Sequence, residues 1–273
     1  MQNSKPTERA RLSMATDYAA CAQSPLPYLE RIAEAGFTHV HWCHHWSTDF
    51  LYSESEVAQI ARWLEELGLG VTDVHGSSGQ EKAWMSLEEY RQLAGVELTE
   101  NRMRMAARLG ADVVVMHIPS LAGEGQWDQT RRTLDYLAPA SRQCGVRIAI
   151  ENGDFDDIGR LLAAYPADYL GLCYDSGHGN MNGRGLQRLD EIKDRLIAIH
   201  LHDNNGQEDQ HKLVFSGTTD WPRLARVIAA SSYRKWMNLE VLIGNTGIKD
   251  EKEFLAAVFE TGTKFAGMVS QCK

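Results

Sequence analysis

Residues 168–203 read DYLGLCYDSGHGNMNGRGLQRLDEIKDRLIAIHLHD. Two short apolar runs in this stretch, 169–174 and 196–201, each end in residues that can bind metals. Asp175 and His178 follow the first run, and His200, His202 and Asp203 close the second. An apolar run of this length that stops at a carboxylate or an imidazole is typical of a buried strand with polar side chains at its carboxyl end. Parallel α/β sheets and barrels keep their active sites at that edge.

Strand-like and helix-like segments alternate along the rest of the chain, which predicts a parallel sheet wrapped by helices. The expected strands cover 12–15, 37–43, 70–75, 111–117, 146–151, 169–174, 196–201 and 236–241. The expected helices cover 27–35, 54–67, 86–109, 126–144, 158–164, 186–193, 221–230 and 251–269. Eight such repeats predict one (β/α)8 TIM barrel, a fold of about 250 residues. We expect residues 10–273 to form it, after a disordered polar tail over 1–9.

Composition excludes several classes of protein. No uncharged apolar run approaches the ~20 residues that cross a bilayer, and the opening residues lack the apolar core of a signal peptide. The five cysteines form no CxxC pair, which fits a reducing compartment, so we expect a cytoplasmic protein. The formal net charge is −9 without any basic run, which argues against a nucleic-acid partner because phosphate backbones would be repelled.

Ligand-type residues end six of the expected strands, and they are His75, His117, Glu151, Asp175, His200 and Glu240. Inward side chains at strand ends converge on the axis of a barrel, so these residues would surround one small volume. A single histidine at a strand end is more often a hydrogen-bonded core residue. Glu151, directly after the apolar run VRIAI, requires a cation partner because an uncompensated buried carboxylate costs several kcal/mol. Six strand ends together predict a metal site.

The sequence resembles the xylose isomerase-like TIM barrels, a family of sugar isomerases, ketose 3-epimerases, inosose dehydratases and type-IV apurinic endonucleases. The resemblance runs from residue 36 to residue 240. Its most specific motifs are IAIEN (148–152), YDSGHGN (174–180), HLHDN (200–204), FSGTTDW (215–221) and LEV (239–241).

The resemblance implies that one divalent metal (Mn, Mg, Co or Zn) is held by Glu151, Asp175, His200 and Glu240, with His178 close to the substrate. It favours His200 over His202 because the family's ligand stands three residues before an aspartate, here Asp203. Glu151 and Glu240 would act as base and acid on a sugar or sugar phosphate, moving a proton through a metal-stabilised enediolate. The family's barrels often pair, so a homodimer is compatible with the resemblance.

Two positions depart from the ketose 3-epimerases, which carry an arginine where this chain has Gly206 and a glutamate where it has Asp157. The resemblance therefore does not narrow from the family to the ketose 3-epimerases. A dehydratase would use the same metal chemistry to expel a hydroxyl. A barrel that binds a metal or a sugar without turnover is a further alternative.

The zinc-dependent apurinic endonucleases are the main rival, because they hold additional zinc through residues that correspond to His75, His117, His178, Asp209 and His211. The acidic or neutral loops after the strands argue against DNA, whose phosphates need cationic partners. In a small-molecule enzyme the same residues would line the pocket or hold a second metal. His41, on the expected second strand, is a further candidate for substrate contact, with packing inside the strand as the alternative.

Overall fold

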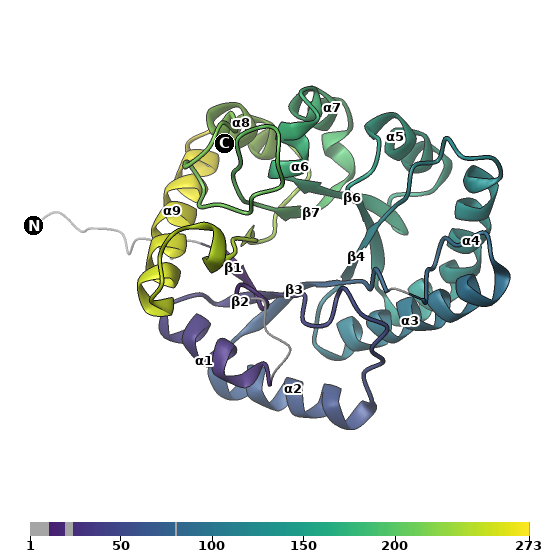
Figure 1. The fold of residues 1–273 in the computed structure, drawn as a ribbon, viewed down its shortest axis with the longest axis horizontal. Coiled ribbons are helices and arrows are strands. Elements are labelled where there is room, and N and C mark those ends of the chain that lie inside the picture. The colour runs from purple at the N-terminus through teal and green to yellow at the C-terminus, as the bar shows by residue number, and fades with distance from the viewer. Residues whose placement is uncertain (1–10, 20–23, 80, 273) are drawn as a thin grey trace, which may run out of the picture.

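The computed structural model describes residues 11–19, 24–79 and 81–272, so the tail expected over 1–9 lies outside the described residues. Eight parallel strands form a ring in the centre, surrounded by helices (Figure 1). The strands are β1 (Leu12–Ala15), β2 (His39–Trp42), β3 (Gly70–His75), β4 (Val113–His117), β5 (Arg147–Glu151), β6 (Leu170–Asp175), β7 (Leu196–His200) and β8 (Met237–Leu239).

Nine α-helices are present among the described residues. They are α1 (Leu26–Glu34), α2 (Glu54–Leu67), α3 (Glu89–Arg108), α4 (Gln126–Cys144), α5 (Phe155–Ala164), α6 (Ser176–Met181), α7 (Gly185–Ile192), α8 (Trp221–Ala230) and α9 (Glu251–Gln271). Two short 3₁₀ turns, Lys193–Arg195 and Ile243–Asn245, follow α7 and β8. None of the helices in the described part of the chain combines the length and the apolar character needed to cross a membrane.

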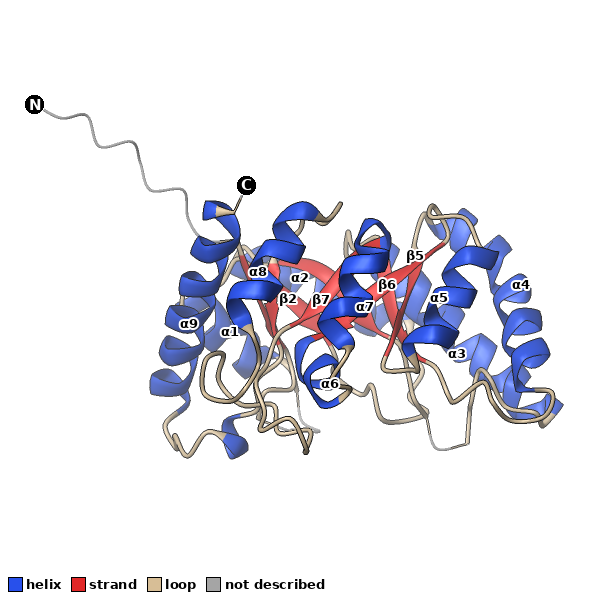
Figure 2. Cartoon of the chain, turned by 90° about the horizontal axis from the view of Figure 1, so that it is seen from above, coloured by secondary structure: helices blue, strands red, loops and turns tan. Residues whose placement is uncertain are grey.

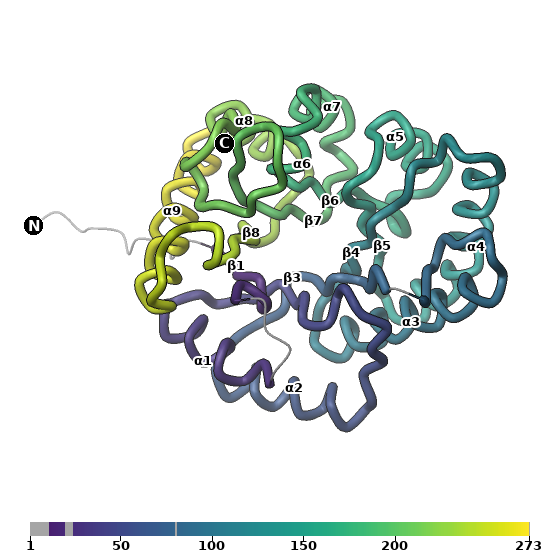
Figure 3. Tube along the Cα trace, viewed as in Figure 1, coloured from purple at the N-terminus to yellow at the C-terminus, as the bar shows by residue number. Residues whose placement is uncertain are grey.

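The sheet closes on itself. Its strand order is β7-β6-β5-β4-β3-β2-β1-β8, and the two end strands meet at a parallel bridge between Leu201 and Leu239. The Leu201 amide donates to the Asn238 carbonyl at 2.9 Å, and the Glu240 amide donates to the Leu201 carbonyl at 3.1 Å. The trace in Figure 3 passes once around the ring and brings α9 beside α1. The predicted single-domain (β/α)8 TIM barrel is therefore confirmed.

Each strand presents one set of side chains to the helices and another to the barrel axis. The large apolar residues, such as Val40, Trp42 and Leu172, belong to the main core between strands and helices. A smaller cluster fills the axis and consists of Val113, Val115, Ala149, Cys173, Ile197 and Ala198. Both faces of the strands are thus buried, which explains the nearly continuous apolar runs in the sequence.

The prediction of eight helices missed α6, which directly follows β6. Asp175 caps this short helix, since its Oδ1 accepts a hydrogen bond of 2.7 Å from the amide of His178. A Cβ on Gly177 would lie 2.1 Å from Cε1 of His202, so only glycine lets the turn approach β7. Glycines disfavour helices, and this explains why no helix is predicted over these residues. Figure 2 shows α6 on the side of the barrel where the loops after the strands lie.

Gly95 gives a test of how α3 supports this side of the barrel. A Cβ at Gly95 would lie 2.2 Å from the backbone nitrogen of Trp84, whose indole donates to the His117 carbonyl at 3.2 Å. We expect Gly95→Ala to lower the melting temperature by roughly 2–12 °C because the backbone must shift. Gly159→Ala in α5 is the control, since no described atom outside the neighbouring backbone of α5 lies within 4 Å of its new methyl group and alanine favours helix. Equal melting temperatures in a calorimetric scan would contradict the close approach.

Candidate metal centre

Five predicted site residues are the last residues of consecutive strands, β3 to β7, and they are His75, His117, Glu151, Asp175 and His200. Glu240 directly follows β8. His178 lies in α6, and Asp209 and His211 lie in the loop after β7. Because the strands are parallel, all these side chains lie at the same end of the barrel.

At that end lies a cavity of about 130 Å³, which we call the central cavity. The residues that line it are Asp17, Trp46, His75, His117, Glu151, Asn152, Asp175, His178, Asp209, His211, Glu240 and Leu242. The structure thus brings eight of the predicted site residues together around one space.

Glu151, Asp175, His200 and Glu240 form the tightest group. Each offers one ligand atom, and these atoms all lie within 4.8 Å of one another. Nδ1 of His200 is 2.5 Å from Oε1 of Glu151 and 3.2 Å from Oε2 of Glu240. The side chain of His200 is fully buried, and 14% of the Glu240 side chain is exposed toward the cavity.

The electrostatics of this group favour ionised carboxylates. Burial alone would raise the pKa of Glu151, but the imidazoles of His200, His117 and His75 outweigh it and hold the pKa well below its usual value. Burial opposes ionisation of Glu240 as well, and His200 again lowers its pKa. Two negative side chains therefore lie beside one imidazole.

A divalent cation fits this set of residues. Both ring nitrogens of His200 are buried and have no partner with hydrogen-bond geometry among the described residues, although carboxylates lie close by. Like charges at this spacing repel unless a cation lies among them. Three carboxylates and one imidazole are ligands that Mn²⁺, Mg²⁺, Co²⁺ and Zn²⁺ accept.

A second group shares Glu151 and includes His75 and His117. Nε2 of His117 is 2.9 Å and Nε2 of His75 is 3.6 Å from Oε2 of Glu151. Nδ1 of His75 donates to the Gly76 carbonyl at 2.7 Å, so Nε2 carries the lone pair in the neutral ring. This tautomer is the one needed for a metal ligand.

A third group lies across the cavity. Oδ2 of Asp209 is 3.4 Å from Nε2 of His178 and 3.2 Å from Nε2 of His211. Burial lowers the pKa of both histidines, but Asp209 and the other carboxylates outweigh it and raise the pKa to about 9 for His178 and about 10 for His211. Both imidazoles are therefore protonated at neutral pH while no metal competes for them.

His41 is not among the residues that line the central cavity. Its ring is fully buried, and Nδ1 makes a very short contact with Oδ1 of Asp73. The same Asp73 oxygen is 3.6 Å from Nε2 of His200. His41 and Asp73 are thus placed to orient His200 from below.

His202, the second choice beside His200, is also buried. Its Nε2 lies 3.0 Å from Oδ2 of Asp175, and its ring stacks on His211 with centroids 3.8 Å apart. It is not part of the four-residue group. The positions that depart from the ketose 3-epimerases stay outside the cavity lining, and Asp157 instead accepts from the Leu121 amide and pairs with Arg160.

Sequence reasoning missed Asp17, Asn152 and Asp73. Asp17 follows a strand of only four residues, and burial raises its pKa even though the Cys43 thiol donates to it at 2.7 Å. Asn152 has a positive φ of 54° and directs its amide to the cavity, a conformation that the sequence does not reveal. Asp73 shares the inward face of β3 with His75, and this alternation was the available signal.

A family model described as xylose isomerase-like TIM barrel matches residues 29–258. Uncharacterized protein y4fM of Sinorhizobium fredii is 34% identical over 246 residues, which cover 78% of this chain and 79% of that protein. A probable endonuclease 4 of Staphylococcus saprophyticus is 25% identical over 139 residues, covering 43% of this chain and 47% of the relative.

Among solved structures, a D-tagatose 3-epimerase-like protein matches with a TM-score of 0.78 and 18% identity. The match covers 96% of this chain and 98% of that protein. At this identity the likeness shows a common fold.

Asp73 offers a test of the support beneath His200. We expect Asp73→Asn to weaken divalent-metal binding by about 10- to 100-fold, because a metal-binding histidine depends on the carboxylate that orients its second nitrogen. The measurement is competition with a chromophoric chelator, per mole of folded protein. Asp112→Asn is the control, because Asp112 pairs with Arg147 and Lys235 at the opposite end of the barrel. Equal metal affinity in the two variants would rule out the orienting role.

Proposed function

The chain belongs to the xylose isomerase-like TIM barrel family, and we propose that it is a metal-dependent sugar isomerase or epimerase. The observation that carries this proposal is the group of Glu151, Asp175, His200 and Glu240, whose ligand atoms lie within 4.8 Å of one another beside the central cavity. A divalent ion held there would polarise a carbonyl group and favour loss of a proton from the adjacent carbon.

Two carboxylates are available for the proton transfer. Glu151 and Glu240 both lie on the cavity, and the neighbouring imidazoles keep the pKa of each below its usual value, so both can accept a proton. One of them, as the carboxylate, removes the proton from the carbon next to the carbonyl, and the other donates a proton to the enediolate when it starts the cycle as the carboxylic acid. Donation by this second group to the opposite face of the same carbon gives an epimer, and return of the first proton by the original base to the former carbonyl carbon gives the aldose–ketose isomer.

The surrounding residues orient the substrate and limit access of water. His178 is protonated at neutral pH and can donate to a substrate oxygen. The ring of Trp46 lies against His75 and His117, with centroids 4.9 and 5.7 Å away. This indole covers one side of the cavity and would shield a reactive intermediate from water.

A zinc-dependent nuclease related to the type-IV apurinic endonucleases is the second candidate. It is favoured by the three neighbouring groups of ligands and by the partial match to a probable endonuclease 4. The net charge of −9 opposes it, because such an enzyme must bind several phosphates. A dehydratase would use the same residues as the isomerase and would differ in the group that leaves the substrate.

Glu151→Gln tests the proton transfer. We expect the variant to fold and to lose more than about 100-fold in kcat, the usual contribution of a general base. Asp157→Asn, six residues later and outside the central cavity, is the matched control and should retain the rate. The measurement is turnover of a panel of ketoses and aldoses with Mn²⁺, Mg²⁺, Co²⁺ or Zn²⁺ added. A near-normal rate for Glu151→Gln would disprove this mechanism.

Metal content separates the two candidate functions. We expect protein purified without added metal to contain about one divalent ion per chain by elemental analysis, held by the tightest group. Close to three zinc ions per chain, together with cleavage of a duplex that contains an abasic site at low salt, would favour the nuclease instead.

A further inference from the structure

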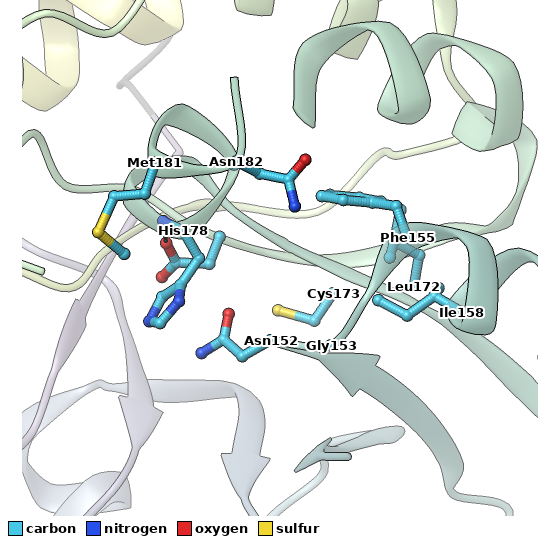
Figure 4. Close-up of a pocket in the computed structure, with 11 residues that line it drawn as sticks. Asn152, Gly153, Phe155, Ile158, Leu172, Cys173, His178, Met181 and Asn182 are labelled. Carbon is cyan, nitrogen blue, oxygen red and sulfur yellow. Dashed lines mark hydrogen bonds between the residues drawn. The ribbon is translucent and has the colours of Figure 1, made fainter. Parts of the chain in front are cut away.

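A second cavity of about 300 Å³ lies next to the central cavity, where β5 and β6 end against α5 and α6 (Figure 4). We call it the side cavity. The residues that line it are Asn152, Gly153, Phe155, Ile158, Leu172, Cys173, Asp175, His178, Gly179, Met181 and Asn182.

The two cavities are neighbours that share a wall. Asn152, Asp175 and His178 line both of them. The central cavity, at about 130 Å³, is smaller than the roughly 300–1,000 Å³ of ordinary small-molecule sites. A sugar whose reacting carbons lie at the metal group therefore needs further room, and the side cavity supplies it on the side of Asp175.

The lining of the side cavity is uncharged away from the shared wall. Phe155, Ile158, Leu172 and Met181 contribute apolar surface, and Asn182 contributes an amide. Oδ1 of Asn152 is buried and has no hydrogen-bond partner among the described residues, and pairing with a substrate hydroxyl would satisfy this acceptor.

Among the described residues, both spaces lack the permanently charged side chains that usually bind a phosphate group. Neither lysine nor arginine is among the described residues that line the two cavities. The imidazoles of His178 and His211, which line the central cavity, are already paired with Asp209. Carboxylates line the central cavity, namely Asp17, Glu151, Asp175, Asp209 and Glu240. A phosphate dianion would meet their repulsion without an arginine or lysine side chain to offset it.

We propose that the substrate is an unphosphorylated hydroxy-carbonyl compound whose far end, a methyl or hydroxymethyl group, occupies the side cavity. Phe155, Ile158 and Met181 contact this end, and Asn152 accepts a hydrogen bond from a hydroxyl closer to the reacting carbons. This inference rests on the proposed isomerase or epimerase function and names its class of substrate.

The test is a matched panel of hexoses and ketohexoses, each supplied as the free sugar, the 6-deoxy sugar and the 6-phosphate. Turnover with added metal is measured by chromatography, and binding is measured by calorimetry on the same protein. We expect kcat/KM for the free or 6-deoxy form to exceed that of the 6-phosphate by at least 100-fold. Turnover that favours the 6-phosphate overturns this inference and leaves the proposed function standing. Neither turnover nor binding of any member overturns both.

Met181→Lys tests the location of the far end. A lysine at the side cavity would pair with a phosphate, so we expect the preference against the 6-phosphate to shrink by 10-fold or more, mainly through KM. Gln187→Lys in α7 adds the same charge to an exposed position outside the cavity lining and should leave the preference unchanged. The same preference in both variants would overturn the assignment of the side cavity.

Discussion

Negative charge is concentrated at the carboxyl ends of β5 to β8, where Glu151, Asp175 and Glu240 surround the imidazole of His200. Burying several carboxylates together is costly, so each must be offset by a positive or hydrogen-bonding neighbour. The imidazoles of His75 and His117, on one side of Glu151, offset part of this cost. A divalent ion at the centre of the group would supply the rest. The arrangement of the barrel mouth follows from this requirement.

The sequence predicted the framework accurately because its signals are local. The bounds of α2, β3, α4 and α8 agree with those expected, since helix caps, glycine ends and strand alternation mark them. The positions of the six ligand-type residues at strand ends could be predicted for the same reason, because each follows an apolar run directly. In a parallel barrel, the carboxyl ends of all the strands lie at the same face, so these residues lie close together.

What the sequence could not supply depends on contacts between distant segments. The helix α6 is held by an Asp175 cap and by glycines that approach β7, and these contacts outweigh its poor helix propensity. The position of Asp73 under His200 depends on how β3 and β7 face each other across the barrel axis. The side cavity likewise arises from the fit of α5 and α6 against the strands, and its apolar residues Phe155, Ile158 and Met181 lie outside the quoted motifs.

Asp175 takes part in two local structures, and this links them thermodynamically. One of its oxygens caps α6, and its carboxylate also belongs to the group suited to a cation. A change in the occupancy of that group therefore changes the stability of the turn that carries His178. Such coupling is reciprocal. If a bound ion changes the affinity for a ligand that fixes His178 by some factor, that ligand changes the affinity for the ion by the same factor. Metal and substrate would then bind with mutual cooperativity, transmitted through a single side chain.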